Sequence, residues 1–323
     1  MQKNPIIFMF SGQGSQYYHM GRDLFLQSPI FRRWMLTLNQ LVQEKTGLSI
    51  TDEIYSEARG RVEQLNQLSI SHPAIFMVEY SLARLFIESG IEPDYVLGAS
   101  LGEFTAAAVA GVISPGEALE WIVKQTELLP KLCGPGGMIA IIDNPDLYRQ
   151  TPALSQGSEL AAVNFASHFV ISGDLIPLQD IEQFLKTRRL MYQTLPVQYG
   201  FHSPNVDPLN NEYLNFLRNF RMNEPQMAMI SCVTGEQLTE VSPEYFWEVI
   251  RRPIQFQKAI AALEKRGSYC YIDLGPAGTL AGFTKQNLTQ DSLSHVYPIM
   301  TSFHQDLKNY GRVMDDLGHP GLE

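Results

Sequence analysis

The chain is poor in cysteine, with only Cys133, Cys232 and Cys270 among 323 residues. Their number is odd and no two have the C-x-x-C spacing, which excludes a disulfide framework and a cysteine-based zinc site. We therefore expect free, buried thiols in the reducing cytoplasm, and no bound metal.

Positive charge is also scarce, because 24 lysines and arginines face 34 aspartates and glutamates and leave a net charge of -10. Binding to nucleic acid gains its affinity from a positive field that releases counterions from phosphates. The composition therefore argues against nucleic acid as a partner.

Long hydrophobic runs are absent as well. The apolar start at residues 6–10 has the length of a strand and stops at a glycine-containing loop, unlike the apolar region of a signal peptide. No later segment reaches the roughly 20 apolar residues that cross a bilayer. The sequence predicts a cytoplasmic protein without a membrane partner.

The overall composition is that of a globular protein, with 45% hydrophobic and 18% charged residues. Residues 6–10 and 95–97 are strand candidates, each followed by a loop and a helix-like segment. From residue 138 the pattern changes to short strands interrupted by one helix near 178–187. This predicts an α/β domain with a small α+β insert that ends near residue 199.

A nucleophile elbow is indicated at residues 98–102, where the sequence reads G-A-S-L-G between a strand and an alanine-rich helix. Small flanking residues permit a strained turn that exposes the Ser100 hydroxyl, and the helix N-terminus places a positive dipole beside it. A tight turn with a helix-capping serine is the alternative interpretation.

Serine needs a base, because its hydroxyl is a weak nucleophile at neutral pH. Among seven histidines, His202 lies in the turn-rich segment QYGFHSP directly after a predicted strand, where a side chain can project into a cleft. A hydrogen-bonded loop histidine without a catalytic role is the alternative. The early loop SGQGSQ is rich in free backbone N–H groups, but it lacks the third glycine of a dinucleotide-binding loop.

The motifs SGQGSQ, GASLGEF, GGMIAI, VNFASHFVISG, YGFHSP and IDLGP occur in this order across about residues 6–280. In order and spacing the chain resembles the acyltransferases that load acyl carrier proteins in fatty-acid and polyketide synthesis. The resemblance implies an α/β-hydrolase-like core formed by residues 1–133 and 199–323, with a ferredoxin-like subdomain at 134–198. It also implies acyl thioester substrates, a phosphopantetheinylated acyl carrier protein as partner, and no cofactor.

The resemblance assigns the catalytic roles residue by residue. Ser100 is the expected nucleophile and His202 the general base, oriented by a backbone carbonyl at Val249 rather than by an aspartate. The backbone N–H groups of Gln13 and Leu101 are the expected oxyanion hole.

The same resemblance assigns residues to the substrate-binding wall. These are Phe201, His72 and Asn164, although a strand-end amide that satisfies backbone groups is a second interpretation of Asn164. Glu103, which follows the elbow, has two interpretations as well, positioning of the first helix or participation in the chemistry.

One position departs from the pattern of the malonyl-using relatives. Their motif V-x-R-x-x-L-L carries an arginine that binds the free carboxylate of malonyl, and here it reads V-K-Q-T-E-L-L with Gln125 in place of the arginine. A neutral amide cannot replace the charged, bidentate guanidinium. Lys124 does not substitute, because adjacent helix positions point about 100° apart.

Two functions are compatible with an intact dyad and no carboxylate clamp. The first, which we prefer, is an acyl hydrolase that removes acyl groups from carrier proteins in polyketide synthesis. The second is a transacylase that loads malonyl or another acyl unit onto a carrier. A noncatalytic carrier-docking module is a third interpretation, disfavoured because both dyad residues and the glycine loop are present.

Overall fold

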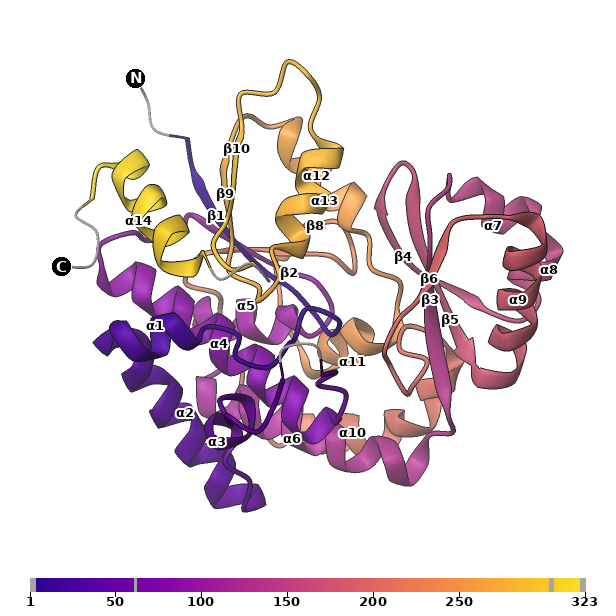
Figure 1. Ribbon diagram of the computed structural model, residues 1–323, viewed down its shortest axis with the longest axis horizontal. Coiled ribbons are helices and arrows are strands. Elements are labelled where there is room, and N and C mark those ends of the chain that lie inside the picture. The colour runs from indigo at the N-terminus through magenta and orange to yellow at the C-terminus, as the bar shows by residue number, and fades with distance from the viewer. Residues whose placement is uncertain (1–3, 61–62, 302–304, 320–323) are drawn as a thin grey trace.

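The computed structural model describes residues 4–60, 63–301 and 305–319. It contains a main sheet of order β10-β9-β1-β2-β7-β8 (Figure 1), in which neighbouring strands are parallel except for the antiparallel pair β7 and β8. The strands of this sheet are β1 (Ile6–Phe10), β2 (Tyr95–Gly98), β7 (Ala228–Ser231), β8 (Glu236–Gln237), β9 (Cys270–Asp273) and β10 (His295–Pro298).

Helices cover both faces of the main sheet. They are α1 (Arg22–Gln27), α2 (Pro29–Thr46), α3 (Ile50–Ile54), α4 (Leu68–Glu88), α5 (Gly102–Val109), α6 (Pro115–Leu132), α10 (Asn210–Leu217), α11 (Pro243–Arg251), α12 (Phe256–Glu264), α13 (Thr279–Asn287), α14 (Asp306–Leu317) and the 3-10 helix η1 (Pro204–Leu209). None of the described helices is both long enough and apolar enough to cross a bilayer.

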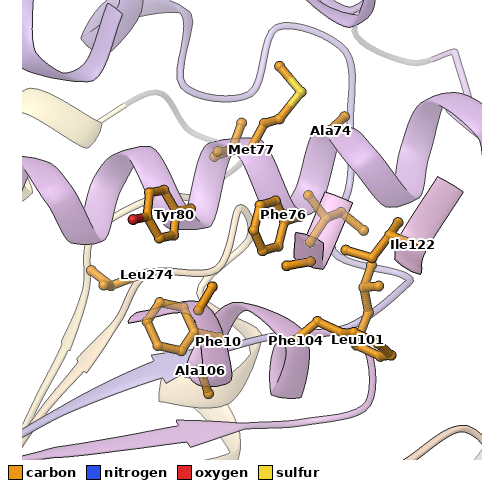
Figure 2. Packing of buried hydrophobic residues seen from close by; sticks show 14 of the residues in the cluster. Phe10, Ala74, Phe76, Met77, Tyr80, Leu101, Phe104, Ala106, Ile122 and Leu274 are labelled. Carbon is orange, nitrogen blue, oxygen red and sulfur yellow. The ribbon is translucent and has the colours of Figure 1, made fainter. Parts of the chain in front are cut away.

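Strand β1 is apolar without interruption because both of its faces are buried. Phe8 and Phe10 join the hydrophobic cluster beneath α2, α4 and α5, whereas Ile7 and Met9 join a second cluster formed with α12 and α13. Alternate side chains of a strand point to opposite faces, so a sheet covered on both sides requires such a run. Figure 2 shows Phe76 of α4 on the side of its helix that faces Phe10.

Helix α6 begins where its sequence predicts. The Ser114 hydroxyl accepts a hydrogen bond from the Glu117 backbone N–H, the Glu117 carboxylate accepts one from the Ser114 N–H, and Pro115 occupies the first helical position. This capping box satisfies two of the N–H groups that a helix start leaves free. It fixes the helix that carries residue 125.

The second sheet has the order β4-β5-β3-β6 and is antiparallel throughout. Its elements follow one another as β-α-β-β-α-β, which is the ferredoxin-like arrangement and confirms the predicted fold class. They are β3 (Gly136–Ile141), α7 (Asp146–Gln150), α8 (Pro152–Ser155), β4 (Glu159–Phe165), β5 (His168–Asp174), α9 (Leu175–Arg188) and β6 (Tyr192–Thr194).

The small subdomain lies beside the core (Figure 1) and is joined to it by hydrogen bonds at several places. Where the chain leaves and returns, the Gly136 N–H donates to the Gln198 carbonyl over 3.0 Å. Further along, the core segment at Ile254 pairs with β4, because its N–H donates to Ala161 O over 2.8 Å and its carbonyl accepts from the Val163 N–H over 2.9 Å. These contacts define the cleft between the two parts.

All three cysteines are free, as expected. Cys232 and Cys270 are buried, whereas Cys133 at the end of α6 is only partly buried. Burial raises the pKa of the Cys270 thiol to about 12, so this side chain acts as a small hydrophobic residue.

Candidate active site

A cavity of about 410 Å³ lies at the carboxyl ends of β1 and β2. Loops that follow neighbouring parallel strands meet at the same edge of a sheet, which is where α/β proteins bind ligands. The residues predicted for the site all line this cavity, namely Gln13, His72, Ser100, Leu101, Gln125, Asn164, Phe201, His202 and Val249.

Ser100 occupies the tight turn between β2 and α5 with a φ of 55°, in the left-handed region that side chains rarely adopt. The turn is possible because glycines stand two residues before and after Ser100 and in the facing loop. A Cβ at Gly102 would overlap the Phe10 carbonyl, and one at Gly12 would lie 2.9 Å from the Ala99 carbonyl oxygen. The G-x-S-x-G pattern therefore lets the elbow approach both β1 and the glycine loop.

His202 also has a positive φ, 63°, and the residue is 2% exposed. Its Nε2 lies 3.0 Å from Ser100 Oγ, and its Nδ1 lies 2.8 Å from the carbonyl oxygen of Arg252. A carbonyl only accepts hydrogen bonds, so Nδ1 carries the proton and Nε2 is left to accept one from the serine. The imidazole is thus arranged as a base for Ser100.

The protonation of His202 is set by its surroundings. Burial lowers the pKa of the imidazole to about 4, against the opposing effect of the hydrogen bond to Arg252. The ring is therefore neutral, and able to take a proton, throughout the physiological range.

The orienting carbonyl was predicted at Val249, and this prediction is wrong, because the acceptor is Arg252. Val249 lies inside α11, whereas Arg252 follows the end of that helix with an extended backbone, φ -88° and ψ 156°. A residue before a proline is pushed out of the helical region, and Pro253 has this effect here. The Arg252 carbonyl consequently turns away from the helix and toward the histidine.

Comparison with known proteins shows the family to which the chain belongs. A model of the acyl transferase domain family matches residues 7–317. The chain belongs to the acyl transferase domain family. This acyl transferase is 44% identical to the polyketide biosynthesis acyltransferase homolog PksD of Bacillus subtilis strain 168, over 96% of this chain and 95% of that protein.

Two further comparisons place the acyl transferase among polyketide proteins. It is 43% identical to the polyketide biosynthesis acyltransferase homolog BaeD of Bacillus velezensis, over 98% of both chains. Among solved structures, the acyltransferase domain from the second module of the salinomycin polyketide synthase superposes with a TM-score of 0.88 at 28% identity, covering all of this chain and 75% of that one. The chain is thus an enzyme of the acyltransferase family with relatives in polyketide synthesis.

The two N–H groups expected to form the oxyanion hole lie on adjacent loops of the acyl transferase. A Cβ placed on Gly12 would be 3.4 Å from the Leu101 nitrogen, which shows how closely the glycine loop approaches the elbow. Within the described residues, neither the Gln13 nor the Leu101 backbone N–H has a hydrogen-bond acceptor. Their role toward a substrate oxygen stays a prediction.

Glu79 of α4 supports this loop, although sequence reasoning missed it. The carboxylate is fully buried and accepts hydrogen bonds from the Ser11 N–H over 2.7 Å, the Ser11 hydroxyl over 3.0 Å and the Thr105 hydroxyl over 2.9 Å. It therefore ties the start of the glycine loop to α5, the elbow helix. The signal was available, because Glu79 is the one charged residue among residues 68–83 of the otherwise largely apolar helix α4.

Replacing Glu79 with leucine should lower the free energy of unfolding by about 2–4 kcal/mol, because it leaves the Ser11 N–H and the Thr105 hydroxyl buried without an acceptor. The Ser11 hydroxyl keeps Ser15 Oγ as an acceptor at 3.0 Å. Glu79→Gln keeps one acceptor and the same shape, so it should cost about 1 kcal/mol or less. Urea unfolding of both variants measures the difference. Equal losses for leucine and glutamine would show that the hydrogen bonds contribute nothing beyond packing.

Glu103 has a structural role at this site. It is fully buried, does not line the cavity, and accepts hydrogen bonds from the Cys232 N–H over 2.7 Å and the Tyr245 hydroxyl over 2.8 Å. Burial raises the pKa of its carboxyl to about 8. Of its two interpretations, positioning of α5 agrees with these contacts.

The wall of the cavity carries Gln125 and His72, which are 3% and 2% exposed. The His72 ring packs against Phe201 with 5.8 Å between ring centroids. Lys124 lies outside the cavity lining, beside the Phe216 ring and 4.0 Å from Glu127, as the helix geometry predicted. Its charge is therefore not available in the cavity.

Asn164 lies on the subdomain side of the cavity and is already engaged. Its Nδ2 lies 3.0 Å from His168 Nδ1, and its backbone carbonyl accepts from the Asn287 amide over 2.8 Å. The side chain thus links the two strands of the β4–β5 hairpin through the His168 ring, rather than satisfying the backbone groups expected in the structural interpretation. A contact with substrate stays a prediction.

Proposed function

We propose that this enzyme is an acyl hydrolase that removes acyl groups from the thioesters of phosphopantetheinylated acyl carrier proteins during polyketide biosynthesis. The observation that carries the proposal is the uncharged cavity around a paired serine and histidine. Among the described residues, no lysine, arginine, aspartate or glutamate lines it.

In the first half-reaction, Ser100 Oγ attacks the thioester carbonyl while His202 Nε2 takes the hydroxyl proton. The oxygen of the tetrahedral intermediate becomes an anion, which the N–H groups of Gln13 and Leu101 stabilise by hydrogen bonding. The carbon–sulfur bond then breaks, and the imidazolium returns its proton to the departing pantetheine sulfur. The product is an ester between the acyl group and Ser100.

In the second half-reaction, His202 Nε2 takes a proton from water as the water oxygen attacks the ester carbonyl. The same N–H groups hold the second oxyanion. Collapse of this intermediate breaks the bond to Ser100, which recovers its proton from the imidazolium. A free carboxylic acid leaves, and the dyad returns to its starting state.

The absence of a cation in the cavity disfavours a dicarboxylic substrate. Gln125 holds the position where the malonyl-using relatives carry arginine, and it is buried without a charged neighbour in the lining. A buried carboxylate that lacks its cation loses about 2–5 kcal/mol, and each 1.4 kcal/mol or so is tenfold in affinity. Loading of malonyl should therefore be slow.

Transfer of an acyl group to a carrier is the second candidate. It is favoured by the names of the similar proteins, which are called acyltransferase homologs. The chemistry of the first half-reaction is the same, and only the second nucleophile differs, a pantetheine thiol in place of water. The fate of the acyl-enzyme therefore separates the two candidates.

The test incubates the enzyme with acetyl-pantetheinyl carrier protein and, separately, with malonyl-CoA and unloaded carrier. We expect acetate release and little malonyl transfer, measured by mass spectrometry of the carrier. Gln125→Arg should raise malonyl uptake about tenfold or more by restoring the cation. Rapid malonyl loading by the unaltered enzyme, with little acid released, would establish the transacylase instead.

A further inference from the structure

Three polar side chains of the cavity lining contain buried atoms that lack a partner. Both ring nitrogens of His72, Oε1 of Gln125 and both amide atoms of Gln13 have no hydrogen-bond partner among the described residues. Other such atoms of the described chain, for example Ser81 Oγ, lie away from the cavity. The cavity therefore has a polar wall that the protein itself does not satisfy.

Buried polar groups are almost always hydrogen-bonded in folded proteins, because leaving one unpaired loses the hydrogen bonds that it makes with water. A group that lines a binding cavity has one further source of partners, which is the bound molecule. Two residues with this property, both lining the cavity and lying on helices that pack against each other, indicate that the ligand supplies a hydrogen-bonding atom there.

The position of the wall limits where on the ligand that atom lies. His72 comes from α4 and Gln125 from α6, two helices that pack against each other. His72 contacts Phe201, the residue before the base His202. The wall is thus next to the dyad, so the acyl atoms within its reach are those close to the thioester carbonyl.

The chemistry of the wall limits the kind of atom. A glutamine amide offers both a donor and an acceptor, and so does a neutral imidazole. Burial lowers the pKa of His72 to about 4, so the ring is uncharged at neutral pH. Such a wall suits a hydroxyl or keto oxygen, whereas a carboxylate would meet no cation.

We propose that the acyl group accepted by this site is uncharged and carries a hydroxyl or keto oxygen on its second or third carbon, hydrogen-bonded by His72 and Gln125. The proposal rests on the proposed function, since it names the substrate class of the same dyad. It assigns His72 and Gln125 to substrate selection rather than to the chemical steps.

The experiment measures acylation of Ser100 by mass spectrometry of the intact protein. The probes are two matched pairs of pantetheine thioesters, butyryl with 3-hydroxybutyryl and propionyl with 2-hydroxypropionyl, together with malonyl. In at least one pair the hydroxylated member should acylate about tenfold faster, because the plain chain leaves the wall groups unpaired. Malonyl should be slower than both members of that pair.

Three variants test the assignment. His72→Phe and Gln125→Met keep the size of each side chain and remove its hydrogen bonds, so each should bring the ratio within a pair close to one, mainly by slowing the hydroxylated substrate. Ser81→Ala removes a buried unpaired hydroxyl of α4 away from the cavity and should keep the tenfold ratio. A thermal melting curve of each variant checks that it is folded.

Three results would overturn the proposal. The unaltered enzyme could be acylated at equal rates by the two members of both pairs, or the preference for the hydroxylated member could persist in both His72→Phe and Gln125→Met. The third such result is malonyl as the fastest substrate. The proposed function fails in a different way. If the hydroxylated substrates acylate Ser100 selectively but the acyl-enzyme persists until a carrier thiol is added, the substrate class stands and hydrolysis does not.

Discussion

Ser100→Ala should abolish acyl-enzyme formation and lower turnover of acyl thioesters by about 10³–10⁶-fold, the range found when a serine nucleophile is removed. The reason is geometric. Ser100 Oγ is 3.0 Å from the imidazole that the proposed mechanism uses as its base. Within the described part of the chain, neither the Gln13 nor the Leu101 N–H has an acceptor. The measurement combines hydrolysis kinetics with labelling by a serine-directed fluorophosphonate.

Ser15→Ala is the matched control for this substitution. Ser15 lines the same cavity, but its hydroxyl donates to the Gly12 carbonyl over 2.9 Å and does not contact His202. The Ser15 variant should still be labelled and should lose at most about tenfold in rate. Labelling that persists in Ser100→Ala would refute the nucleophile assignment. Failure of the probe to label Ser100 in the unaltered enzyme would restore the interpretation as a noncatalytic docking module.

The pH dependence of acylation should reveal a base that stays active in mild acid. The ordinary pKa of histidine is about 6.5, whereas burial lowers that of His202 to about 4. At pH 5.5 a base of pKa 4 is almost fully neutral, but one of pKa 6.5 retains only about a tenth of that form. Single-turnover acylation should therefore be nearly constant from pH 7 to about 5.5 and fall below it.

The same shift predicts a dependence of stability on pH. Between pH 6.5 and 4 the unfolded chain binds a proton at His202 that the folded chain does not, so stability is lost as pH falls through this window. For a shift of this size the loss is about 3 kcal/mol. The difference in unfolding free energy between the unaltered enzyme and His202→Gln should shrink accordingly on acidification. A constant difference would contradict the lowered pKa.

Local features of the sequence predicted much of the fold. The apolar run at Ile6–Phe10 became β1, and the Ser114-Pro115 signal marked the start of α6. In both cases the deciding interactions lie within one element or its immediate neighbours. Strand β10 (His295–Pro298) escaped prediction because a short, half-exposed edge strand has no strong hydrophobic pattern.

The site was predicted less evenly. Ser100 and His202 are 102 positions apart in the sequence, so no local pattern could pair them. The prediction of this pair came from the resemblance to the acyltransferases. The orienting carbonyl was misplaced because it depends on how the chain leaves α11 at Pro253. Glu79 was missed because its partners are distant in sequence and gather around it only in the folded protein.

Both members of the dyad have a left-handed backbone, with φ of 55° at Ser100 and 63° at His202. For residues with a Cβ this conformation costs roughly 1–2 kcal/mol each, a penalty that glycine avoids. Selection of variants for thermal stability alone would therefore favour glycine at these two positions. A laboratory search for a more heat-stable enzyme should include activity among its criteria, because the changes that relax this backbone remove the side chains on which the proposed mechanism depends.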